Sequence, residues 1–326
     1  MAKIAILFSG QGAQYPGMGK DLYDVSPAAK AVFDAAGDDI KEKSFFGTKE
    51  ELSQTQITQP TVFAVEVAAY EAFKEAYQAA NDGNLPEIAA TAGFSLGEFG
   101  AYTAAGVIPT ISEATSLIKT RANLMMESGK YDDGSPRGGM LAALGKKDDI
   151  LTLVEKVRGD DVLEGVNFNG PTQTVIAGDK AALERFAQAA ADKANNVKRA
   201  IPLSVSTAFH SEIMNKASVG LAEAVKDIEF EKPAFDIYLN ATGDKLDLQA
   251  FSSDTIRQLI VTQVKSPVQW QKTIEQMVSD GIDTVIEFGP GSTLTGLVKK
   301  ITKEIKTYNV SDAETLNATV EAISAL

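Results

Sequence analysis

The sequence predicts an α/β fold in which a core with a parallel sheet carries a smaller inserted subdomain. Two patterns lead to this prediction. Short apolar segments alternate with helical segments toward both ends of the chain, and two apolar segments follow each other directly in its middle. The 326 residues are 44% hydrophobic and 23% charged, so the chain is long and apolar enough to bury a large core.

Three strands of the core are expected at residues 4–8, 88–94 and 284–288, because each is a short and mostly apolar run. A glycine-containing turn follows each run, for example Ser-Gly-Gln-Gly after the first and Gly-Pro-Gly after the last. Residues 60–80 carry apolar groups at helical spacing, and a further helix is expected to extend through Lys299. Strands that alternate with helices in this way are typical of a parallel sheet.

The middle of the chain follows a different order. A glycine-rich stretch at residues 134–139 is typical of a linker. The pattern beyond it predicts a strand, a helix, two strands, a helix and a strand, at residues 140–144, 147–157, 162–167, 174–177, 180–193 and 197–203. This β-α-β-β-α-β order is ferredoxin-like. We therefore expect a small subdomain at residues 134–204, inserted into a core of residues 1–133 and 205–326.

The composition excludes several classes of function. A net charge of −13 disfavours binding to nucleic acids, which requires a basic surface. The lack of cysteine excludes disulfides, thiolate zinc sites and a cysteine nucleophile, and the single histidine, His210, excludes a histidine-rich metal site. The sequence has no run of 18 apolar residues and no signal peptide, so we expect no membrane-spanning helix and a cytoplasmic location.

Residues 93–97, Gly-Phe-Ser-Leu-Gly, fit the pattern G-x-S-x-G between a predicted strand and a predicted helix. The two glycines allow a sharp turn, the nucleophile elbow, which exposes the hydroxyl of Ser95. The helix N-terminus beneath it favours developing negative charge. Ser95 is therefore a candidate nucleophile, and a purely structural strand-to-helix turn is the alternative.

A nucleophilic serine needs a base, and His210 is the only imidazole in the chain. We expect His210 to be this base, although a lone histidine is otherwise more often structural. The backbone N–H at Gln11, in the turn after the first strand, and that of Leu96 are candidates for an oxyanion hole. An ordinary glycine-rich loop is the alternative for Gln11. Arg121 is a solvated charge unless the protein has to hold an anionic substrate.

Several separated segments resemble those of bacterial malonyl-CoA:acyl-carrier-protein transacylases, the family shared with the acyltransferase domains of polyketide synthases. The similar segments are Phe-Ser-Gly-Gln-Gly at 8–12, the elbow with Glu98, Arg121, Ala-Phe-His-Ser at 208–211, Gln-Val-Lys-Ser-Pro-Val-Gln-Trp at 263–270 and Glu-Phe-Gly-Pro-Gly at 287–291. They span nearly the whole chain. The resemblance implies a hydrolase-like α/β core with a ferredoxin-like insertion, which agrees with the pattern above.

The resemblance also implies an activity. Malonyl-CoA would acylate Ser95 with His210 as the base, and the malonyl group would pass to the phosphopantetheine thiol of acyl carrier protein, supplying fatty acid synthesis. The expected partners are thus acyl carrier protein and a coenzyme A thioester. No metal or other cofactor is expected, nor any nucleic acid or membrane partner, and the protein is expected to be a monomer.

The resemblance further assigns roles to five other residues. They are Gln11 and Leu96 for the oxyanion N–H groups, Arg121 for the malonyl carboxylate, Gln263 for orienting His210 by its main-chain carbonyl, and Asn167 for lining the site from the small subdomain. Family members usually have histidine before the nucleophile, where this chain has Phe94. This departure bears on substrate preference and leaves the base in place.

Three alternatives stay open at this point: a thioester hydrolase with the same serine and histidine, a free-standing polyketide-synthase acyltransferase, and a non-catalytic module that docks a carrier protein. Carrier proteins are typically acidic, so a local basic patch is needed on a chain with a net charge of −13. The candidate residues are Lys299, Lys300, Lys303 and Lys306 on a C-terminal helix, and Lys193, Lys198 and Arg199 at the edge of the small subdomain.

Overall fold

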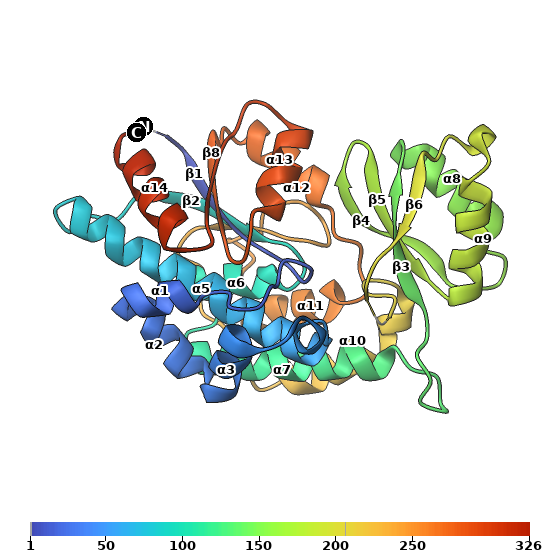
Figure 1. Cartoon of the computed structure of the whole chain (residues 1–326), viewed down its shortest axis with the longest axis horizontal. Coiled ribbons are helices and arrows are strands. Elements are labelled where there is room, and N and C mark those ends of the chain that lie inside the picture. The colour runs from blue at the N-terminus through green and yellow to red at the C-terminus, as the bar shows by residue number, and fades with distance from the viewer. Residues whose placement is uncertain (1, 206) are drawn as a thin grey trace.

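The computed structural model describes residues 2–205 and 207–326, and within them the chain forms two separate sheets (Figure 1). The larger sheet has five parallel strands in the order β7-β2-β1-β8-β9. Its strands are β1 (Ile4–Phe8), β2 (Ile88–Gly93), β7 (Asp236–Tyr238), β8 (Thr284–Phe288) and β9 (Lys306–Val310). The α/β fold class expected from the sequence is confirmed.

The smaller sheet has four antiparallel strands in the order β4-β5-β3-β6. Its strands are β3 (Gly139–Leu144), β4 (Leu163–Gly170), β5 (Gln173–Gly178) and β6 (Arg199–Pro202). Helices α8 (Lys147–Val157) and α9 (Lys180–Ala190) connect them in the ferredoxin-like order and lie together on one side of this sheet (Figure 1). All of these elements fall inside residues 134–204, and the division into domains at those bounds stays a prediction.

Helices pack on both faces of the larger sheet because the side chains of its strands alternate between them. Ile6 and Phe8 of β1 contribute to the main apolar cluster, whereas Ala5 and Leu7 join a second cluster on the other face. The helices of this part of the chain are α1 (Lys20–Val25), α2 (Pro27–Ala36), α3 (Asp38–Phe46), α4 (Lys49–Leu52), α5 (Thr55–Ala80), α6 (Gly97–Ala104), α7 (Ile111–Ser128), α10 (Asn215–Val225), α11 (Ser253–Gln263), α12 (Trp270–Ser279), α13 (Thr293–Ile301) and α14 (Ala313–Ser324).

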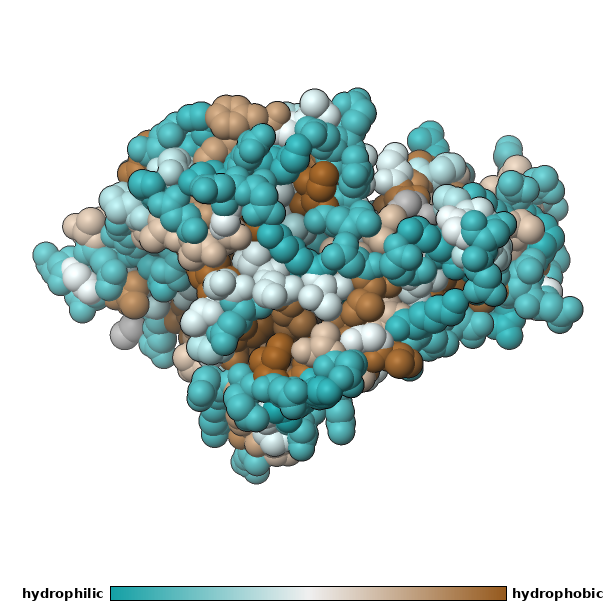
Figure 2. Space-filling model, turned by 90° about the horizontal axis from the view of Figure 1, so that it is seen from below, coloured by the Kyte–Doolittle hydropathy of each residue, from teal (hydrophilic) through white to brown (hydrophobic). Residues whose placement is uncertain are grey.

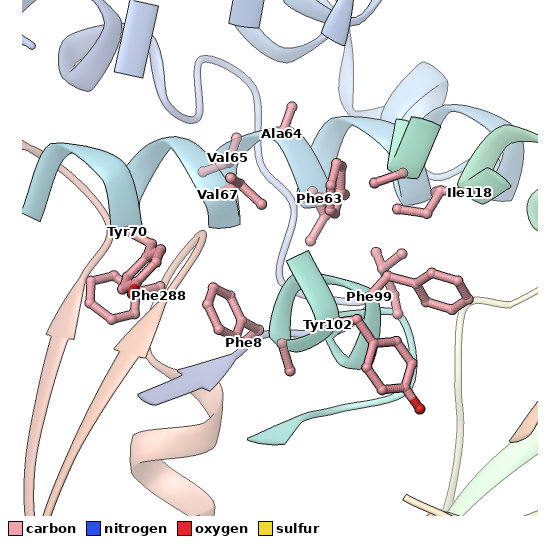
Figure 3. Close-up of a cluster of buried hydrophobic side chains, with 14 of the residues drawn as sticks. Phe8, Phe63, Ala64, Val65, Val67, Tyr70, Phe99, Tyr102, Ile118 and Phe288 are labelled. Atoms are coloured by element: carbon pink, nitrogen blue, oxygen red, sulfur yellow. The ribbon is translucent and has the colours of Figure 1, made fainter. Parts of the chain in front are cut away.

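Aromatic side chains fix the long helix α5 against the centre of the larger sheet (Figure 3). The Tyr70 ring lies edge-on to Phe8 of β1 and Phe288 of β8, with ring centroids 6.0 and 5.3 Å away. Each such pair contributes about 0.5–1.5 kcal/mol beyond the apolar area that it buries. The packing holds the C-terminal ends of β1 and β8, and the turns that follow them, in a fixed position.

A short main-chain contact links the edge of the small sheet to a segment of the core. The N–H of Phe168 in β4 donates to the carbonyl of Val268 at 2.9 Å, and the N–H of Val268 donates to the carbonyl of Val166 at 2.8 Å. Asn167 lies between these bonds and forms a parallel bridge with Val268. The edge of the small sheet is therefore anchored to a segment of the core, and Asn167 is brought to the junction.

Several elements differ from the sequence expectation. The helix expected at 60–80 begins at Thr55 and has Pro60 in its interior, and the one expected at 180–193 ends at Ala190. The prediction that Lys303 and Lys306 lie on the C-terminal helix is wrong. Helix α13 ends at Ile301 because Thr302 is extended (φ −140°), so Lys303 lies in a bend after the helix and Lys306 begins β9.

The surface seen from below is mainly hydrophilic, with hydrophobic residues gathered near the centre of that face (Figure 2). Over the described residues 2–205 and 207–326, no helix combines the length and apolar character needed to cross a membrane.

Candidate active site

The nucleophile elbow joins β2 to α6, and its geometry explains both of its glycines. A Cβ atom on Gly93 would lie 1.9 Å from the carbonyl carbon and oxygen of Gly97, and one on Gly97 would lie 2.2 Å from the carbonyl oxygen of Phe8. Real Cβ atoms do not approach backbone atoms so closely, so larger residues would push strand and helix apart. Between the glycines, Ser95 has a left-handed backbone (φ +53°) that points its side chain out of the turn.

The structure brings Ser95 and His210 into contact. The Oγ atom of Ser95 lies 2.7 Å from Nε2 of His210, and Nδ1 of His210 lies 3.1 Å from the main-chain carbonyl oxygens of both Gln263 and Ser266. Carbonyls only accept hydrogen bonds, so they assign the ring proton to Nδ1 and leave the Nε2 lone pair for the serine hydroxyl. The expected orienting contact at Gln263 is thus present in the geometry, with a second carbonyl beside it.

The environment of His210 keeps its ring neutral. Burial of the imidazole and the positive charge of Arg121 lower its pKa to about 4, against the opposing effect of the carbonyls of Gln263 and Ser266. A histidine with this pKa is unprotonated at neutral pH. It can therefore accept the proton of Ser95 as a general base.

Arg121 of α7 is fully buried and points at the same place. Its Nη1 donates to Oε1 of Gln59 at 2.7 Å, and its Nη2 donates to Oε1 of Gln263 at 3.0 Å and to Oγ of Ser95 at 3.3 Å. Burial lowers its pKa to about 10, so the guanidinium remains charged at neutral pH. Among the described residues it forms no ion pair, and its Nε has no hydrogen-bond partner. A buried cation whose hydrogen bonds within the described residues all go to neutral oxygens is well placed to receive an anionic group.

Three further polar residues at the site lie outside the sequence prediction. Gln59 of α5 accepts a hydrogen bond from Arg121. Glu98 of α6 is buried, and burial raises its pKa to about 7, although the hydrogen bond from the N–H of Asn240 acts to lower it. Asn240, just after β7, hydrogen-bonds to the elbow. Glu98 follows the elbow directly in the sequence, which was an available signal. Gln59 and Asn240 lie in segments without any motif, so the sequence carried no comparable signal for them.

The two candidate oxyanion donors line the same cavity as Ser95. It has a volume of about 90 Å³ and includes Gln11, Leu96, Arg121 and His210 in its wall. The side chain of Gln11 is fixed by a 3.1 Å hydrogen bond from its Nε2 to Oγ1 of Thr55. Within the described part of the chain the main-chain N–H groups of Gln11 and Leu96 have no protein acceptor. Both N–H groups are free to donate to a ligand oxygen.

A second cavity of about 190 Å³ adjoins the first and shares Gln11, Phe94, Asn167 and Leu203 with it. The Oδ1 atoms of Asn167 and Asn169, both on β4, are buried without a hydrogen-bond partner among the described residues. The predicted site residue Asn167 thus lies at the junction of the two cavities.

Phe94 also lines both cavities. Its ring packs edge-on against Trp270 with centroids 5.5 Å apart. At the position where a histidine was expected from the resemblance, the wall is therefore apolar.

Known proteins are similar to this chain over nearly its whole length. Residues 6–319 match the model of a family described as acyl transferase domain. The malonyl CoA-acyl carrier protein transacylase of Bacillus subtilis (strain 168) is 36% identical over 99% of this chain and 98% of its own length. The protein of the same name from Haemophilus influenzae is 36% identical over 98% of this chain and 99% of its own length.

Solved structures are similar over the same extent. The malonyl CoA-acyl carrier protein transacylase of Clostridium perfringens has a TM-score of 0.88 at 33% identity and covers 99% of this chain and 98% of its own. A malonyl-transacylase described in complex with its type II polyketide synthase acyl-carrier protein also has a TM-score of 0.88 at 33% identity, and covers 98% and 100%. This chain therefore belongs to the acyl transferase domain family.

Proposed function

We propose that this protein transfers a malonyl group from malonyl-CoA to the phosphopantetheine thiol of an acyl carrier protein, through an acyl-serine at Ser95. One observation carries the proposal: the buried guanidinium of Arg121, which forms no ion pair with a carboxylate of the described residues, lies 3.3 Å from the hydroxyl of Ser95. An acyl group that ends in a carboxylate satisfies this cation while its thioester carbon meets the nucleophile. The names of the relatives support the same substrate and partner.

In the first half-reaction the Oγ of Ser95 attacks the thioester carbon and its proton moves to Nε2 of His210. The N–H groups of Gln11 and Leu96 stabilise the tetrahedral oxyanion. The bond to sulfur then breaks, and the coenzyme A thiolate takes the proton from His210 as it leaves. The malonyl group remains as an ester on Ser95.

The second half-reaction runs through the same atoms. The phosphopantetheine thiol of the carrier protein gives its proton to His210 and attacks the ester carbon, and Oγ of Ser95 leaves and recovers the proton. Two chemically similar steps at one serine give ping-pong kinetics. The steps use only the protein and its two substrates, and we propose that they need no further cofactor and take place in a cytoplasmic monomer.

The sharpest test is the intact mass of the protein after addition of malonyl-CoA and then of holo carrier protein. The expected result is a malonyl adduct that disappears as the carrier protein gains the same mass. Ser95→Ala should form no adduct, while Ser116→Ala, an exposed serine on α7, should behave as the wild type. An adduct that decays at the same rate without carrier protein would assign the protein to the thioester hydrolases instead.

A further inference from the structure

The side chain of Asn240 hydrogen-bonds to the nucleophile elbow at two points just before Ser95. The Nδ2 of Asn240 donates to the carbonyl oxygen of Gly93 at 2.6 Å, and the Oδ1 of Asn240 accepts the N–H of Ser95 at 2.7 Å. Asn240 is itself buried. A single carboxamide thus binds the peptide groups on both sides of Phe94, which lead into the left-handed backbone of Ser95.

Asn240 is held in a rigid frame of its own. It lies two residues beyond Tyr238, the last residue of β7, which pairs with Ala92 of β2 just before the elbow. Its main-chain N–H donates to Oε1 of Glu98 at 2.9 Å, and its main-chain carbonyl accepts the N–H of Gln269 at 2.8 Å. The carboxamide therefore has a fixed position relative to the sheet.

We propose that Asn240 is a positioning residue for acyl transfer, whose carboxamide holds the elbow in the conformation that directs the Ser95 hydroxyl to His210. By binding the N–H of Ser95 it also leaves the N–H of Leu96 as the amide that faces the cavity. The inference rests on the proposed function, because it takes Ser95 to be the residue that is acylated.

The hydrogen-bonding requirement is specific. The group at this position must donate to a carbonyl and accept from an N–H at the same time, which a carboxamide does. A carboxylate accepts from the N–H of Ser95 but places a second oxygen, without a proton, against the carbonyl of Gly93. A protonated carboxylic acid restores the donor, so its pattern matches the carboxamide again.

Asn240→Asp is therefore a test in which pH controls whether both hydrogen bonds to the elbow can form. We call this pair of bonds, to the carbonyl of Gly93 and the N–H of Ser95, the clamp. At about pH 8 we expect the variant to be about 10²-fold slower in kcat than the wild type, the usual effect of a reacting group displaced by about 1 Å. The ratio of variant to wild-type kcat should rise toward one as the pH falls to about 5 and the introduced carboxyl takes up a proton. The charged and titratable groups of the site, Glu98 beside Asn240 and Arg121 and His210 around Ser95, are common to both proteins, so their own titration largely cancels in the ratio.

Asn309→Asp is the matched control, since it makes the same change on β9 of the larger sheet. There the side-chain hydrogen bonds to described residues are long, at 3.4 and 3.5 Å. Its ratio should not depend on pH. A second variant, Asn240→Ser, has a side chain too short to bind both groups. We expect it to lower kcat at every pH by about as much as Asn240→Asp does at about pH 8, with KM for malonyl-CoA nearly unchanged.

The outcomes separate the two levels of the proposal. If wild-type protein is not acylated at Ser95, the proposed function fails and the clamp falls with it. If wild-type protein is acylated, a pH-independent ratio for Asn240→Asp overturns the clamp alone. Should Asn240→Asp not fold at the higher pH, judged by its melting temperature, a normal kcat in folded Asn240→Ser overturns the clamp as well.

Discussion

Ser95 and His210 meet at 2.7 Å, and both have a left-handed backbone, with φ of +53° and +62°. For residues other than glycine such conformations cost about 1–3 kcal/mol each. The cost falls on both partners of one contact, and surrounding groups hold each in place. These are Asn240 and Gln263 at the backbone of Ser95, and the carbonyls of Gln263 and Ser266 at the ring of His210. The site is thus held in its reactive geometry before substrate arrives.

Removal of the imidazole should slow the first half-reaction. We expect His210→Ala to reduce the rate of acyl-enzyme formation by about 10²–10⁴-fold, the usual range for a lost general base. Single-turnover mixing with malonyl-CoA, quenched and read by intact mass, gives this rate. A variant that acylates at nearly the wild-type rate would remove His210 from the mechanism.

The pH profile of the wild type follows from the same ring. The base must be neutral, and the pKa of His210 is lowered to about 4, so the acylation rate should stay flat as the pH falls from neutrality and decline only as it approaches that value. Part of the lowering comes from the charge of Arg121. In Arg121→Ala the acidic limb should therefore move to higher pH, and a limb that stays in place would contradict this electrostatic coupling.

Arg121 should decide between substrates with and without a carboxylate. Truncating one partner of a buried charge-assisted pair costs about 2–5 kcal/mol, so Arg121→Ala should lower kcat/KM for malonyl-CoA by roughly 30- to several-thousand-fold. Acetyl-CoA lacks the carboxylate, and its rate should fall little. Arg121→Lys keeps the charge without the planar guanidinium, so its kcat/KM for malonyl-CoA should lie between those of the wild type and Arg121→Ala.

The two substrates measured side by side provide the internal control. Equal loss on both, in a variant of unchanged melting temperature, would exclude Arg121 from substrate choice.

Glu98 should make stability depend on pH. Burial raises its pKa to about 7 in the folded protein, above the value of 4.5 for a free side chain, so the folded state binds this proton more tightly. This contribution to stability is complete below the unfolded pKa and is lost as the pH rises through 7. Glu98→Gln lacks it and keeps an acceptor for the N–H of Asn240. Relative to the wild type, the free energy of unfolding of Glu98→Gln should rise by up to about 3 kcal/mol from acid to neutral pH.

Urea denaturation at several pH values measures this difference. Glu321→Gln, an exposed change on α14, serves as the control. If the free energy of unfolding of Glu98→Gln relative to the wild type does not change with pH, the Glu98 carboxyl of the wild type has the same pKa in the folded and unfolded states.

The basic end of α13 is one of the two candidate docking surfaces for the carrier protein, the other being the edge of the small subdomain with Lys193, Lys198 and Arg199. Thr293, Leu294 and Leu297 of this helix line the second cavity, and Lys299 and Lys300 are exposed at its end. Reversing both charges should raise KM for an acidic carrier protein about tenfold, since an exposed ion pair contributes about 0.2–1 kcal/mol, and leave KM for malonyl-CoA unchanged. Lys226→Glu, at the exposed end of α10, is the control. If it has the same effect, overall charge rather than docking is responsible.

The sequence was most informative where a strong local pattern meets glycine boundaries. The strands at residues 4–8 and 284–288 and the helix at 147–157 have the observed bounds, because apolar runs or helical spacing end there at turns. The three residues of β7 are too few to show a period, and β9 is only partly buried, so neither produced a pattern.

The site was predictable only in its motif-bearing parts. The G-x-S-x-G pattern identifies Ser95, and His210 is identified because it is the single histidine of the chain. Their contact joins residues 115 apart in the sequence and follows from the tertiary fold. Gln59 and Asn240 could not be found in the same way. A buried amide contributes to the site through two or three hydrogen bonds, and these depend on neighbours that are distant in sequence.

The antiparallel pairing of β3 with β6 has a consequence for how the chain assembles. It places Leu141 beside Pro202, so the strands that enter and leave the small sheet are neighbours. Once this sheet has formed in an otherwise unfolded chain, the length of chain that separates Ser95 from His210 falls to about half, because the pairing bypasses the residues between Leu141 and Pro202. Loop closure becomes cheaper by about 0.6 kcal/mol for each halving, so early folding of the insertion lowers the entropic barrier to joining nucleophile and base.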